Sequence, residues 1–197
     1  TRFINDPEHK DNQAMYVARL SNEVDRLEKT LGGLVELVRV QAIEDTMHTI
    51  SFESILEQLK TEFDETLQEA TASIETNFEA YPSIVYLKAF LLIIFRNLLS
   101  NALKYRSDNH ALQITISSEK SDRFVLLKFK DNGQGIDLKK NGKNLFKPFK
   151  QLSPKTDGIG LGLHLVKYTV ERNGGKIEVE SKPDHGTNFL VYLKEYR

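Results

Sequence analysis

Cysteine and tryptophan are absent from these 197 residues, and the chain contains only two methionines and five prolines. Without cysteine there is no disulfide, no thiolate metal ligand and no cysteine nucleophile. This absence is typical of a reducing compartment. An apolar core must hold the fold together, and 40% hydrophobic residues are enough to build one.

The chain also lacks a long hydrophobic run and an excess of charge of one sign. Its longest apolar run is 89–95, far shorter than the ~20 residues that span a bilayer. The N-terminus is polar and has no signal-peptide pattern, and its first residue is not methionine. We therefore expect a cytoplasmic portion of a longer protein, with any membrane anchor outside this chain. A formal net charge of −1 does not favour nucleic acid as a partner.

A heptad pattern runs through the first third of the chain. Apolar residues alternate at spacings of three and four, which predicts a helix with one apolar seam. Such a seam packs against another helix, from the same chain or a second copy, and the alternative is a helix on the domain core. The seam consists of Val17, Leu20, Val24, Leu27, Leu31, Leu34 and Val38.

Beyond a boundary near 42–47, the pattern predicts an α+β domain with one mixed sheet and helices on one face. A short strand leads into a helix capped near Ser51, and a long apolar helix is predicted from Pro82 to Lys104. A glycine-led helix is predicted from Gly160 to Asn173. The other predicted strands are "ASIETNF", "ALQITISS", "RFVLLKFKDNG", "GKIEVES" and "TNFLVYL".

Two asparagines lie four residues apart on the apolar helix, in "FRNLLSNALKYR". Asn97 and Asn101 share a face with Lys104 and nearly with Tyr105. An asparagine oxygen suits Mg²⁺ when phosphates supply the remaining charge, and the lysine can act as a point charge on those phosphates. The alternative is a solvated helix face, but the surrounding residues are so apolar that unpaired asparagines would be costly.

Glycine-rich segments follow in "KDNGQGID" and "DGIGLGLHLVK". The first comes directly after a strand and is either a ligand loop or an ordinary turn. The second leads into a helix whose N-terminal amides would point at an anion. It matches neither the dinucleotide fingerprint nor a P-loop. Between them "NLFKPFKQL" is either a loop plug or an aromatic hinge.

These clusters, in this order, resemble the ATP-binding catalytic domain of bacterial two-component sensor histidine kinases. "NLLSNALKY" is similar to the N box, "DNGQGI" to the G1 box, "LFKPF" to the F box and "GIGLGLHLVK" to the G2 box. The resemblance implies a two-layer α/β sandwich with a mixed, mainly antiparallel sheet (the Bergerat-type ATP-binding fold) over 45–197. Residues 1–44 resemble the second helix of the dimerisation and phosphotransfer hairpin.

The resemblance also implies the roles of the site residues, with ATP and Mg²⁺ as the ligands. Asn101 would bind the metal, Asn97 and Lys104 would face the triphosphate and act in catalysis, and Tyr105 would pack beside the nucleoside. Asp131 would accept a hydrogen bond from the adenine amino group. The remaining implied binding residues are Gly133, Gly135 and Thr187 near the base, Gly158, Gly160, Leu161 and Gly162 around the phosphates, and Phe146 and Phe149 as a hinge.

The phosphoacceptor histidine of this family precedes an acidic residue, and none of the five histidines here has that context. We therefore expect the acceptor outside this chain, a homodimer through the helical hairpin, and a response-regulator receiver domain as partner. One alternative is a nucleotide-binding or dimerising module without kinase activity. Another is a hydrolytic relative, but those carry a glutamate where this chain has Asn97. An anti-sigma-factor kinase or an unrelated coiled-coil protein are further alternatives.

Overall fold

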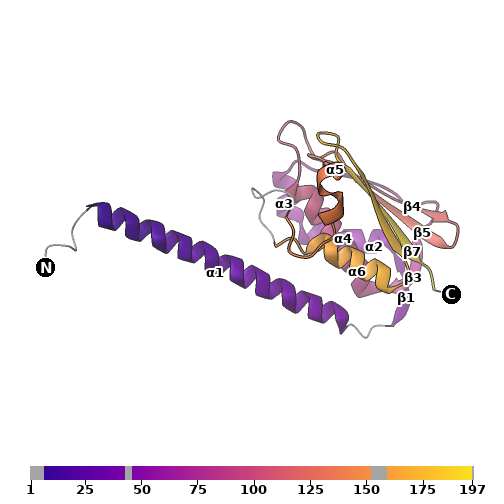
Figure 1. The fold of residues 1–197 in the computed structure, drawn as a ribbon. Coiled ribbons are helices and arrows are strands. Elements are labelled where there is room, and N and C mark those ends of the chain that lie inside the picture. Colours follow the sequence, from indigo (N-terminus) through magenta and orange to yellow (C-terminus); the bar gives the residue numbers. More distant parts are fainter. Residues whose placement is uncertain (1–6, 43–45, 152–158, 197) are drawn as a thin grey trace. The chain divides into compact units, whose positions relative to one another are not determined.

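The computed structural model describes residues 7–42, 46–151 and 159–196, which form two compact units, Thr1–Gln41 and Ala42–Arg197. Within the first unit the described residues form one helix, α1 (Pro7–Gln41), drawn in indigo in Figure 1. It is longer at both ends than the heptad seam from Val17 to Val38 and lies within the predicted helical region 1–44. All seven residues of the heptad seam are between 44% and 67% exposed. The assignment of α1 to a dimerisation hairpin stays a prediction.

A five-stranded sheet forms one layer of the second unit. Its strand order is β2 (Ser73–Asn77), β4 (Gln113–Ser121), β5 (Phe124–Asp131), β7 (Thr187–Lys194) and β6 (Lys176–Ser181). Only β2 and β4 run parallel, and the other three pairs are antiparallel. The predicted mixed, mainly antiparallel sheet is confirmed, as are the five strands predicted for it.

The prediction of a helix from Pro82 is wrong at its first turn. Residues Ser83–Leu87 form strand β3, which pairs antiparallel with β1 (Met47–Ser51), and the helix α4 begins only at Lys88 and ends at Lys104. The segment contains Ile84, Val85 and Tyr86, whose branched and aromatic side chains favour a strand. The prediction of one sheet is corrected in the same way, because β1 and β3 form a second, two-stranded sheet.

Helices cover one face of the five-stranded sheet (Figure 1). Helix α2 (Phe52–Glu62) begins after Ser51, whose hydroxyl accepts the Ser54 amide, as predicted. Helix α6 begins at Gly162, two residues later than predicted, and ends at Arg172 before Gly174 at φ +72°. The short elements are α3 (Asp64–Glu69), α5 (Leu138–Asn141) and η1 (Gly142–Asn144).

Helix α4 is the centre of the helical layer. Nine of its 17 residues are buried, including Phe90, Leu91 and Phe95, and it packs against α6. Burial of side chains of this size contributes about 1.5–3 kcal/mol each relative to exposure. No helix in the described part of the chain is both long and apolar enough to cross a membrane.

Candidate nucleotide-binding site

Two polar residues end the apolar rows that line the core face of the sheet. On β5 the buried row Val125, Leu127 and Phe129 continues to Asp131, which is 8% exposed. On β7 the row of alternate residues begins with Thr187, which is 7% exposed and pairs with Asp131 in the register. Side chains of a strand alternate between its faces, so both polar groups point to the core side. Asp131 and Thr187 therefore form a buried polar surface, the polar floor, at this end of the core face of the sheet.

The Asp131 carboxylate is held by backbone amides on one oxygen. Oδ1 accepts hydrogen bonds from the Gly133 amide at 2.8 Å and from the Thr187 amide at 3.3 Å. Burial raises the pKa of Asp131 above its ordinary value, and the two amides oppose that rise. Oδ2 accepts no hydrogen bond from the described residues. The arrangement leaves one acceptor oxygen for a donor on a ligand.

The turn after β5 requires glycine at position 135. Gly135 has φ +68°, and a Cβ there would overlap the backbone carbonyl of Lys182. Ser181, the last residue of β6, supports the same turn and was missed in the sequence prediction. Its hydroxyl accepts the Ile136 amide at 2.8 Å, donates to the Gly186 carbonyl at 2.7 Å and lies 3.0 Å from Thr187 Oγ1. The signal in the sequence for Ser181 was its place as a polar residue at the end of a strand with alternating side chains.

The C-terminal end of α4 joins this turn. The Gln134 amide donates to the Tyr105 carbonyl at 2.9 Å, and its side chain donates to the Arg106 carbonyl at 2.9 Å. The Lys104 ammonium lies 5.2 Å from the centre of the Tyr105 ring. The structure therefore places the end of the N box beside the G1 turn.

The two asparagines of α4 differ in their hydrogen bonding. Asn97 donates from Nδ2 to the Ile93 carbonyl at 2.8 Å, one turn earlier. Asn101 Nδ2 is buried and has no hydrogen-bond partner among the described residues. A buried polar atom without a partner is costly, so the Asn101 side chain is the one that a ligand would satisfy.

The glycine-led helix meets the N box directly. A Cβ on Gly162, the first residue of α6, would lie 2.7 Å from Asn97 Oδ1. Leu161, just before it, is 3% exposed and anchors the helix start in the core. The backbone of Gly160 packs against that of Lys150. Gly158 lies outside the described residues.

The aromatic residues of the F box are placed differently from each other. Phe146 is half-buried, and its carbonyl lies 3.1 Å from His164 Nδ1. Phe149 is 45% exposed and has φ +59°, in the left-handed region that few residues other than glycine adopt. The hinge role of these two residues stays a prediction.

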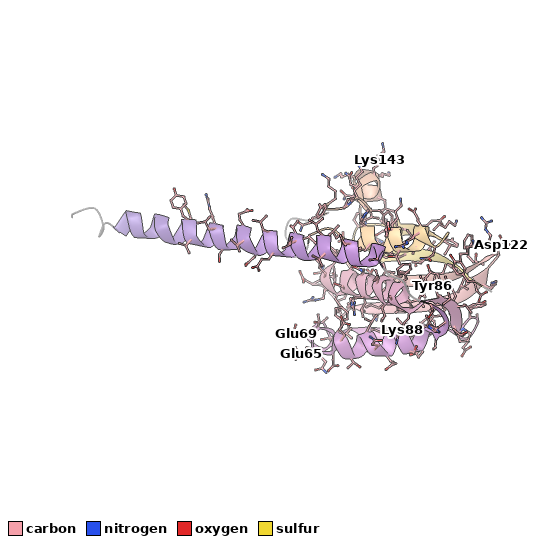
Figure 2. The ribbon with its side chains drawn as sticks, turned by 90° about the horizontal axis from the view of Figure 1, so that it is seen from below. Glu65, Glu69, Tyr86, Lys88, Asp122 and Lys143 are labelled. Atoms are coloured by element: carbon pink, nitrogen blue, oxygen red, sulfur yellow. The ribbon has the colours of Figure 1, made fainter. Side chains whose placement is uncertain are left out.

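Charge is unevenly distributed over the second unit. Residues 138–150 contain five lysines and no acidic residue, and all five lysines are exposed. Figure 2 shows one of them, Lys143, on the opposite side of the unit from Glu65 and Glu69 of α3. A concentration of positive charge in one segment favours an anionic ligand.

Comparison with known proteins agrees with this geometry. The sequence pattern of the histidine kinase-, DNA gyrase B- and HSP90-like ATPase family matches residues 87–197. The chain belongs to this family. The matched region includes the end of β3, helices α4 and α6, the Asp131 floor and both glycine segments. These residues form the ATP-binding domain of the type found in sensor histidine kinases.

Two curated relatives of this chain are bacterial sensor proteins. Over 100 residues it is 38% identical to the alginate biosynthesis sensor protein KinB of Pseudomonas aeruginosa, covering 51% of this chain and 16% of that protein. Over 191 residues it is 26% identical to the sensor-like histidine kinase SenX3 of Mycolicibacterium smegmatis, covering 94% and 49%. The chain therefore spans at most about half of the length of these two curated relatives.

A solved structure shares the fold. The Acinetobacter baumannii histidine kinase AdeS superposes with a TM-score of 0.65 at 22% identity, covering 99% of this chain and 88% of that one. This likeness shows that the two chains share the same arrangement of strands and helices. The predicted fold class is confirmed.

Proposed function

We propose that this chain binds Mg²⁺–ATP and transfers the γ-phosphoryl group to a histidine outside these 197 residues, for relay to a response-regulator aspartate. The buried Asp131 carboxylate carries the proposal, because one of its oxygens is fixed by two amides and the other has no donor among the described residues. Family membership supports the choice of ATP as the nucleotide.

Asp131 would select adenine over guanine. Its free oxygen can accept from the exocyclic amino group of adenine, whereas guanine presents a carbonyl at that position. Gly133 and Thr187 hold the carboxylate in place, and the close approach of Gly133 to the Tyr105 carbonyl leaves no room for a side chain there. The resulting selectivity comes from a buried charged acceptor, which rejects a ligand that leaves it unpaired.

The residues of α4 fit a bound magnesium ion. Asn101 offers a neutral amide oxygen, and its Nδ2, buried without a partner, would be satisfied by a ligand oxygen. Mg²⁺ supplies neutralisation of the charge that develops on the phosphates. Lys104 would add a point charge, and Asn97 would face the phosphates from beside the start of α6.

Catalysis by these residues would consist of positioning and charge neutralisation. Asn97 carries no carboxylate and therefore cannot act as a general base toward water, which favours transfer over hydrolysis. The amides at the start of α6 would point at the phosphates. The acceptor histidine would be supplied by the rest of the protein, where α1 would pair with a second hairpin helix in a homodimer.

Calorimetric titration with ATP and GTP, each with and without Mg²⁺, tests the nucleotide site. The wild type should bind ATP selectively. Asp131→Asn should weaken ATP binding by about 10- to 150-fold, corresponding to 1.5–3 kcal/mol for a hydrogen bond to a charged group. Asp122→Asn, on an exposed turn between β4 and β5 that Figure 2 labels, is the matched control and should bind as the wild type does.

Binding of neither nucleotide by the wild type would contradict the proposal. The location of the acceptor is tested separately by incubating the chain with γ-labelled ATP. We expect no acid-labile phosphate on this chain, and a labelled histidine within residues 1–197 would show that the acceptor is internal.

A further inference from the structure

His164 contacts the F box from the first turn of α6. Its Nδ1 lies 3.1 Å from the Phe146 carbonyl oxygen. Because a carbonyl oxygen only accepts, the imidazole must donate from Nδ1. A neutral ring in this contact therefore carries its hydrogen on Nδ1. His164 is half-buried.

The same face of α6 holds the ring of Phe146. Lys167 lies one turn after His164, and its ammonium is 5.5 Å from the centre of that ring. The ammonium is also 3.6 Å from Glu171, a further turn along. Phe146 is thus contacted through its backbone by one residue of α6 and through its ring by another.

The segment held in this way is continuous with the glycines at the start of α6. Leu145, before Phe146, is buried at 4% exposure. Four residues after Phe146 the chain reaches Lys150, and a Cβ on Gly160 would lie 2.5 Å from the Lys150 carbonyl oxygen. The position of residues 145–150 therefore limits where Gly160 can lie, and Gly162 in turn contacts Asn97.

We propose that His164 is a positioning residue that holds residues 145–150 against α6 and thereby fixes the backbone of Gly160 and Gly162 beside Asn97. Its effect on ATP affinity rests on the proposed function, whereas its effect on residues 145–150 does not.

Hydrogen exchange of the nucleotide-free protein tests the contact itself. His164→Leu removes the donor, and the amides of 145–150, except at Pro148, which has none, should exchange about three- to tenfold faster, as expected for one hydrogen bond. Amides of β5 should not change. His164→Asn, whose Nδ2 can take the place of Nδ1, should restore slow exchange. His48→Leu, an exposed histidine on β1, is the control.

ATP affinity gives the second readout. It should fall about three- to tenfold in His164→Leu and recover in His164→Asn. Unchanged exchange of 145–150 in His164→Leu, or no recovery with asparagine, would overturn the proposal. Should the leucine variant not fold, the imidazole nitrogen shifts of the wild type decide: a neutral Nε2–H tautomer is incompatible with the contact. Faster exchange in a chain that never binds ATP would refute the proposed function and leave the positioning role intact.

Discussion

The two ends of the site are built in different ways. At the Asp131 end, the carboxylate and Thr187 are buried, the amides of Gly133 and Thr187 donate to the carboxylate, and Ser181 supports the turn around them. At the Asn101 end, the side chains of Asn97, Asn101, Lys104 and Tyr105 are half-buried, and Asn101 Nδ2 has no partner among the described residues. Both ends keep a polar atom for a ligand, but the Asp131 carboxylate is already fixed by two amides, whereas the Asn101 amide nitrogen has no partner among the described residues.

This difference suits the two halves of a nucleotide. A flat, rigid base is best recognised by an acceptor that is already fixed, because little is then lost in ordering the protein. A flexible, charged triphosphate with its metal ion brings its own ligands and can satisfy polar groups on arrival. The four predictions below test the comparison, from the largest expected effect to the smallest.

The preformed end should tolerate no side chain in its turn. Gly135→Ala places a Cβ against the Lys182 carbonyl at φ +68°, so we expect a loss of about 2–3 kcal/mol or more in the free energy of unfolding. Urea denaturation measures it. The control is Gly142→Ala, where the nearest atom to the new Cβ is 4.0 Å away, and equal midpoints for the two variants would show that the turn is not rigid.

Nucleotide binding at the Asn101 end should depend on Mg²⁺. Loss of an outer-shell partner of a metal site costs about 10- to 100-fold in metal affinity. In Asn101→Ala the affinity for Mg²⁺–ATP should fall by at least that much. Affinity for ATP measured with a chelator present should fall less, because only the contact of the amide nitrogen is then lost. Asn109→Ala, on an exposed loop, provides the comparison. A loss of equal size with and without Mg²⁺ would argue against Asn101 as the metal ligand.

The contact between α6 and the N box should affect binding without destabilising the fold. Gly162→Ala brings a Cβ within 2.7 Å of Asn97 Oδ1. A misplacement of 1 Å in a site can cost about 100-fold. We expect ATP affinity to fall by less than that. The free energy of unfolding should not fall, because alanine favours a helix over glycine by up to about 1 kcal/mol. Calorimetry and thermal denaturation of one preparation separate the two effects.

The buried Asp131 carboxylate should lower the free energy of unfolding at neutral pH. Its pKa is raised in the folded state above the ordinary value of 3.8, so the folded protein binds more protons than the unfolded chain as the pH rises past 3.8. The contribution of Asp131 to stability therefore decreases with rising pH until its folded pKa is passed. Asp131→Asn should remove this decrease and unfold at a higher temperature at neutral pH. An unchanged pH dependence of the melting temperature would contradict the assignment.

Much of the fold was predicted from the sequence because its signals are local. The five strands of the main sheet follow from alternation, the Ser51 cap from a hydroxyl before an apolar helix, and the helix in the first third from its heptads. The exposed heptad seam of α1 shows the limit of such signals. A seam predicts that a helix needs a partner and says nothing about which one.

The error at Ser83–Leu87 has a physical cause. The segment is apolar and continuous with α4 in sequence, and a short apolar run before a helix has no periodicity to separate the two. Its strand conformation depends on hydrogen bonds to β1, about 35 residues earlier in the chain. That pairing is a property of the folded chain and has no local signature.

The sequence by itself determined which chemical groups the site has: an aspartate after a strand, two asparagines on a helix, and glycines before another helix. Only the tertiary structure decided how they meet, since Asp131 pairs with Thr187 across 56 residues and Gly162 lies against Asn97. It also gave roles to Ser181 and His164, whose contacts join segments distant in sequence. Residue types and spacings are local properties of a chain, whereas burial and hydrogen bonding depend on which distant segments pack together.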